Sequence, residues 1–116
     1  MIDILNILAA LLTIAFGAFG FLAPRFTADA LDLEPRGSTM GLSEMRASVG
    51  GLFVMLGLTC LWIGAPMAYA MMGIAYAGAA AGRGLSLVLD GPPMPKALIY
   101  FGIEAALAAW LILANL

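Results

Sequence analysis

The feature that most constrains this chain is the length of its uncharged runs. Residues 4–23 form one run of 20 residues and residues 47–82 form another of 36. Only 10% of the 116 residues are charged and the mean hydropathy is +1.06, whereas a soluble domain carries about 25% charged residues. Most of the chain is therefore expected to lie in lipid, as a single membrane domain over residues 1–116.

The runs predict four membrane-spanning helices. A bilayer core of about 30 Å needs roughly 20 apolar residues of helix, so residues 4–23 can cross once. This run lacks the positively charged flank of a secretory signal and is expected to be retained. Gly64, Ala65 and Pro66 predict a tight turn inside the second run. The expected spans are residues 4–23, 43–63, 66–89 and 96–115.

The polar segment 24–42 joins the first two spans. A short helix lying at the membrane interface from Pro24 to about Leu33 and an ordinary solvated loop both fit its sequence. The expected fold class is all-α, an integral membrane four-helix bundle with up-down topology.

The positions of the basic residues predict an orientation. All five Lys and Arg residues lie in or beside the segments 24–46 and 83–96, which share one side of the expected bundle. The positive-inside rule places loops 24–42 and 90–95 in the cytoplasm and both termini outside. The expected location is a bacterial inner membrane.

Four ionisable residues are expected at one depth inside the spans: Glu44, Arg46, Arg83 and Glu104. Antiparallel helices joined by a short turn bring residues equidistant from the turn to the same level. The midpoint of Arg83 and Glu104 falls in the proline-rich loop, and that of Arg46 and Arg83 in the Gly64 turn. Glu104 is expected about 12 Å beyond Lys96 at 1.5 Å per residue.

Unpaired charges at this depth are costly, so these side chains should face the bundle interior and form pairs. The closest predicted pair is Arg83 with Glu104, and Arg46 is expected to pair with either carboxylate. Ser86 and Asp90 follow Arg83 at i+3 and i+7 and extend this polar layer along one helix face. The layer either binds a ligand or only sets the helix register.

Several chemistries are not supported by the sequence. There is no histidine and the only cysteine is Cys60, so no metal site, no cofactor and no catalytic constellation is predicted. Enzymatic activity is left open and is not favoured, because nearby arginines keep Glu44 and Glu104 ionised. The net charge of −2 gives no basic surface for nucleic acid.

Small residues and tryptophans give weaker predictions. Gly50 and Gly51 predict a close neighbour at the backbone, and Gly78 and Gly82 form a spacing that permits close helix approach. Trp62 and Trp110 are expected to be interface anchors.

Two motifs carry a resemblance to a known family. The segment GLSEMRA at residues 41–47 is followed by Gly50 and Gly51, and GRGLSLVLDG at 82–91 precedes a carboxylate in the last helix. Over nearly the whole chain this pattern resembles a bacterial family of small four-helix membrane proteins of unknown function, broadly DoxX-like. The resemblance implies an up-down bundle and assigns no activity. DoxX-like proteins include quinone-linked subunits and assembly factors, so it favours lipophilic-ligand or accessory roles by analogy.

Three functions therefore remain open from the sequence. The first is a membrane protein that binds a lipophilic ligand (a lipid or quinone) or serves as an accessory protein, using the Glu/Arg layer. The second is a structural or assembly subunit of a larger membrane complex, and the third is a small transporter or channel. The expected partners are membrane lipids, a quinone or other lipophile, and further copies of the chain or a larger complex.

Overall fold

The computed structural model describes residues 2–116, with side chains from residue 3 onward, and this part of the chain is helical without strands. The predicted all-α class is confirmed. Four stretches are long and apolar enough to cross a membrane: Asp3–Leu22, Met40–Ile63, Pro66–Leu89 and Met94–Asn115. The elements are α1 (Ile2–Leu22), α2 (Pro24–Ala30), α3 (Met40–Glu44), the π-helix η1 (Met45–Gly51), α4 (Leu52–Ile63), α5 (Pro66–Leu89) and α6 (Met94–Asn115).

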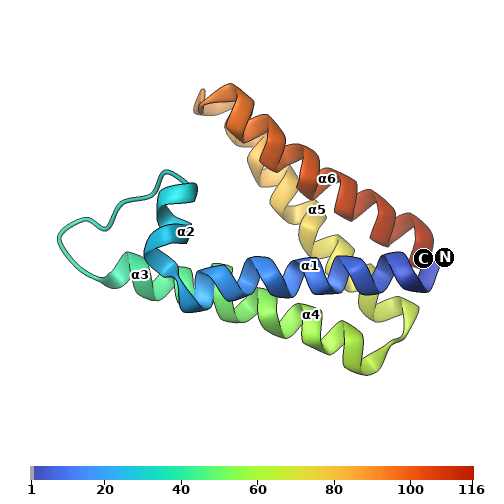
Figure 1. Cartoon of the computed structure of the whole chain (residues 1–116). Coiled ribbons are helices and arrows are strands. Elements are labelled where there is room, and N and C mark those ends of the chain that lie inside the picture. The colour runs from blue at the N-terminus through green and yellow to red at the C-terminus, as the bar shows by residue number, and fades with distance from the viewer. Residues whose placement is uncertain (1) are drawn as a thin grey trace. The chain divides into compact units, whose positions relative to one another are not determined.

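The chain forms two compact units, Asp3–Ile63 and Gly64–Leu116, here called the first and the second unit. In the first unit α3, η1 and α4 follow one another without a break and run alongside α1 in the opposite direction (Figure 1). The second unit is an antiparallel pair of α5 and α6 (Figure 1). Two antiparallel pairs of long helices are consistent with the predicted helical bundle.

Glycines let the long helices of the first unit approach closely. A Cβ on Gly50 would lie 2.5 Å from the backbone nitrogen of Phe21, and one on Gly17 would lie 2.6 Å from that of Val54. A real Cβ does not come this close to a backbone atom, so the two backbones pack directly at these positions. The close neighbour predicted for Gly50 is therefore α1, whereas Gly51 has no such contact with α1.

The polar segment contains the short helix that was one of its two predicted forms. Pro24 occupies the first turn of α2, where its missing N–H costs nothing. The helix ends after Ala30 in a Schellman motif. Asp32 adopts the left-handed conformation with φ 59°, and the N–H of Leu33 donates to the carbonyl of Ala28 at 2.8 Å.

The second unit is a hairpin whose helices pack through small and apolar side chains. Met72 and Leu111 are fully buried, and a Cβ on Gly73 would lie 2.7 Å from the Cβ of Leu111. Pro66 starts α5, and Gly91, with φ 57°, follows the last residue of the hairpin's first arm. The contact of Gly73 with Leu111 and the close approach of Gly84 to Phe101 set the antiparallel register of α5 and α6.

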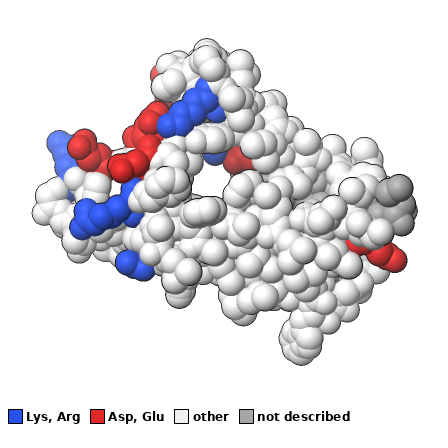
Figure 2. Space-filling view, viewed as in Figure 1, with Lys and Arg blue, Asp and Glu red and all other residues white. Residues whose placement is uncertain are grey.

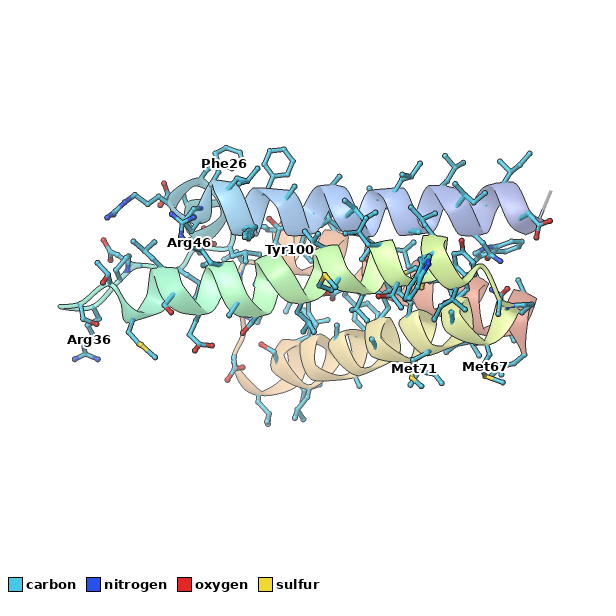
Figure 3. The ribbon with its side chains drawn as sticks, turned by 90° about the horizontal axis from the view of Figure 1, so that it is seen from below. Phe26, Arg36, Arg46, Met67, Met71 and Tyr100 are labelled. Atoms are coloured by element: carbon cyan, nitrogen blue, oxygen red, sulfur yellow. The ribbon has the colours of Figure 1, made fainter. Side chains whose placement is uncertain are left out.

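Both units leave broad apolar helix faces exposed, as helices in lipid do. In Figure 3, Met67 and Met71 project outward from α5, and both are exposed. The spacing at Gly78 and Gly82 permits a close helix approach, but a Cβ at either position would meet nothing within 4 Å. In Figure 2 most charged atoms of the first unit gather around the α2–α3 end, and its helix sides are largely uncharged.

The two tryptophans differ from each other. Trp62 is 87% exposed, which agrees with an anchor at the membrane surface. Trp110 differs from that expectation, because its indole Nε1 is buried and has no hydrogen-bond partner within residues 2–116.

Candidate functional site

The candidate site is an ion pair inside the second unit. The guanidinium of Arg83 on α5 binds the carboxylate of Glu104 on α6 through two parallel hydrogen bonds. Nε donates to Oε1 at 2.8 Å and Nη2 donates to Oε2 at 3.0 Å. This bidentate geometry is the strongest arrangement available to an arginine and a carboxylate. The predicted pairing of Arg83 with Glu104 is present.

The antiparallel hairpin brings the two residues side by side, as their hydrogen bonds show. Arg83 lies about 9 Å before the end of α5, and Glu104 lies about 15 Å after the start of α6, at 1.5 Å per residue, so the two residues are not equidistant from the ends of the loop. Both positions fall within stretches that are long and apolar enough to cross a membrane. The pair therefore belongs to the apolar part of the hairpin and not to its connecting loop.

The prediction that this salt bridge is buried is wrong. The side chain of Arg83 is 32% exposed and that of Glu104 is 17% exposed. Pairing occupies only the Nε–Nη2 edge of the guanidinium, and it leaves part of the Arg83 side chain exposed.

The end of the guanidinium that does not face Glu104, its Nη1 tip, carries further hydrogen-bond donors. A guanidinium has five N–H groups, and the pair with Glu104 uses one on Nε and one on Nη2. Within residues 2–116, both N–H groups of Nη1 lack a hydrogen-bond acceptor. Donors left without partners are costly in an apolar medium, so this tip is suited to bind an acceptor.

An aromatic ring borders the same guanidinium. The Cζ of Arg83 lies 5.3 Å from the centre of the Tyr100 ring, a cation–π distance. Sequence reasoning did not single out Tyr100, although it precedes Glu104 by four residues and so shares its face of α6. Together, Tyr100 and Glu104 hold the guanidinium from two sides.

Ser86 and Asp90, predicted to extend the polar layer, form no hydrogen bond with the pair in the described part of the chain. Asp90 is exposed at the end of α5, where its N–H donates to the carbonyl of Ser86 at 2.8 Å. Ser86 is half-buried. Their spacing from Arg83 keeps them on one side of α5, and their role in a ligand site remains a prediction.

Arg46 has a different partner from the carboxylate predicted for it. Its Nη1 donates to the backbone carbonyl of Phe21 at 2.7 Å. Figure 3 shows Arg46 at the same end of the first unit as Phe26. Glu44 instead accepts a hydrogen bond from the hydroxyl of Ser48 at 3.2 Å. Because Glu44 and Arg46 belong to the first unit, their common layer with Arg83 and Glu104 stays a prediction.

The π-helix is the second feature that sequence reasoning missed. η1 spans Met45–Gly51 and therefore contains both Arg46 and Gly50. A π-turn holds an extra residue per turn and shifts the residues on either side, and such segments are frequent at functional sites. The available signal was the Gly50-Gly51 pair, since adjacent glycines weaken regular α-helix.

Comparisons with known proteins place the chain in a family. A family model described as a domain of unknown function, DUF4345, matches residues 1–115. No curated protein and no solved structure matches the chain. With the match extending over nearly all of its length, the chain belongs to the DUF4345 family.

Proposed function

We propose that this protein is a multi-pass protein of a bacterial inner membrane that binds the polar head of a lipophilic ligand, a lipid or a quinone, at Arg83. The observation that carries the proposal is the guanidinium itself. It lies in an apolar hairpin, Glu104 binds one of its edges, the donors of Nη1 have no partner within residues 2–116, and the side chain is partly exposed.

The apolar surroundings of Arg83 suit the rest of such a ligand. Leu85 on α5 and Ile103 on α6, which lie near the paired residues in the sequence, are both exposed. An acyl or isoprenoid chain could follow these helix faces while its head group accepts hydrogen bonds from Nη1. Ligand sites of this kind combine an apolar wall with a few placed polar groups.

The location and the DoxX-like resemblance belong to the same proposal. Four membrane-compatible helices, with all five basic residues in or beside the segments 24–46 and 83–96, support an inner-membrane protein with cytoplasmic loops 24–42 and 90–95. The resemblance to DoxX-like proteins supports a lipophile-linked or accessory role, as an analogy alone.

Native mass spectrometry of the purified protein tests the proposal. The wild type is expected to retain a lipophilic molecule, and Arg83→Ala is expected to lose it. Glu104→Gln is the matched comparison, because it also weakens the ion pair but keeps the guanidinium, so it should retain the molecule. A wild type without any bound lipophile, or an Arg83→Ala variant that keeps it, would overturn the proposal.

A structural role is the second candidate, and the bidentate geometry favours it specifically. The two parallel hydrogen bonds between Arg83 and Glu104 fix the register of α5 against α6. Such bonds matter in lipid because there is little hydrophobic driving force for helices to associate. Under this alternative Arg83→Ala and Glu104→Gln should alter stability to similar extents and leave bound lipophiles unchanged. If the protein is a subunit of a larger complex, the wild type should also migrate with that complex in native gels of its own membranes.

A further inference from the structure

The charges of Arg83 and Glu104 cancel, and this limits the chemical class of a ligand that Arg83 could bind. Resting on the function proposed above, we infer that the head group held at Nη1 is a neutral carbonyl acceptor and not an anion such as a lipid phosphate. A quinone oxygen and the ester carbonyl of a neutral lipid share this chemistry.

The first argument is electrostatic. The carboxylate of Glu104 accepts two bonds of 2.8 and 3.0 Å from the guanidinium, so the pair has no net charge. An anion at Nη1 would be repelled by Glu104 and would bring an uncompensated charge into an apolar stretch. Moving an ion out of water costs several kcal/mol even after relaxation. A neutral carbonyl adds no charge and still satisfies the donors.

The second argument compares the two arginines that lie within membrane-compatible helices. The guanidinium of Arg46 binds a neutral carbonyl, that of Phe21, at 2.7 Å. This contact shows the geometry that a carbonyl adopts on a guanidinium of this same chain. Arg46 has no carboxylate partner among residues 2–116 and keeps its full charge, so an anionic head group would find a stronger attraction there than at Arg83.

The test measures binding of three defined molecules to purified protein stripped of lipid in a neutral detergent. Decylubiquinone supplies a quinone carbonyl, dioleoylglycerol supplies neutral ester carbonyls, and dioleoylphosphatidylglycerol supplies an anion. The wild type is expected to bind at least one neutral molecule about tenfold more tightly than the anion, which corresponds to about 1.4 kcal/mol. The neutral molecule that binds identifies the source of the carbonyl.

Glu104→Gln is the diagnostic variant, because it exposes the charge of Arg83 while preserving side-chain shape. Measured against binding of the neutral molecule to the same variant, binding of the anion should rise about tenfold from its relative value in the wild type. Gly78→Ala on the open side of α5 is the control and should match the wild type. Should Glu104→Gln fail to fold, the salt dependence of the wild type replaces it: neutral binding should not respond to added salt, whereas anion binding should weaken.

The outcomes separate the two proposals. If the anion binds as tightly as the neutral molecules and Arg83→Ala abolishes both, the inference about head-group chemistry is overturned and the proposed function stands. If no molecule binds in a manner that depends on Arg83, the proposed function fails as well.

Discussion

Arg46 caps the end of helix α1 through the carbonyl of Phe21, to which its Nη1 donates at 2.7 Å. The last carbonyls of a helix lack intrahelical partners and carry partial negative charge. Phe21 is the second-last residue of α1, so its carbonyl is one of these terminal groups. The guanidinium of Arg46 on η1 satisfies it, and this bond ties the two long helices of the first unit together.

The first prediction is that Arg46→Ala destabilises the first unit by about 1 kcal/mol, the usual net contribution of such a hydrogen bond. Hydrogen exchange should rise at the end of α1 and in α2. Arg25→Ala is the matched control, because Arg25 is exposed and forms no hydrogen bond or ion pair in the described part of the chain. Equal effects of the two substitutions would contradict the capping role.

The second prediction concerns Gly50. Gly50→Ala should destabilise the protein by more than about 2 kcal/mol, since the new Cβ meets the backbone of Phe21 and no flexible side chain can yield. Gly78→Ala introduces the same methyl group into open space and should be neutral or stabilising by about 0.5 kcal/mol through helix propensity. Thermal unfolding in detergent measures both. Similar losses for the two variants would refute the packing argument.

Much of the fold could be predicted from the sequence because lipid imposes few solutions. Uncharged runs of about 20 residues must be helices, and Gly64-Ala65-Pro66 marks the end of α4 and the start of α5. The same arithmetic placed Arg83 opposite Glu104, because a short loop forces residues equidistant from it to one level. These predictions needed only the length of each helix and the position of each turn.

Tertiary detail was not predictable in the same way. The close contact predicted at Gly50 is present, but the one at Gly17 was not predicted, and the spacing at Gly78 and Gly82 has no neighbour. Spacing alone does not say which helix face meets another helix. The partner of Arg46 was missed because a backbone carbonyl carries no sequence signature. The sequence predicted a buried Arg83–Glu104 salt bridge, but the pair is partly exposed. Pairing satisfies the donors on one edge of the guanidinium and does not require the rest of the side chain to be covered.

The third prediction tests the membrane orientation. In a Cys60→Ala background, Ser38→Cys should react with a membrane-impermeant thiol reagent only after the cells are opened. Ala65→Cys, at the opposite end of the expected spans, should react in intact cells. The basic residues beside the α2–α3 segment are the physical cause, because they resist translocation. Labelling of both positions, or the reverse pattern, would contradict the predicted orientation.

The fourth prediction separates two quantities: the stability lost when one member of the Arg83–Glu104 pair is removed, and the net contribution of the pair to stability. Arg83→Ala and Glu104→Ala each leave one ionised group unpaired in an apolar stretch and should each destabilise by about 1–3 kcal/mol. The double variant removes both charges and should be more stable than either single variant. The coupling energy of this double-mutant cycle, measured by unfolding in detergent, should therefore exceed the loss of stability in either single variant.

Ligand binding gives a second readout for the same single and double variants of Arg83 and Glu104. If the pair acts only through the register of α5 and α6, the double variant should recover every property of the wild type along with its stability. If Arg83 holds a head group, stability returns in the double variant but the bound lipophile does not, because the donors of Nη1 are gone. Additive losses in the cycle would show that the two side chains do not act as a pair, whatever distance separates them.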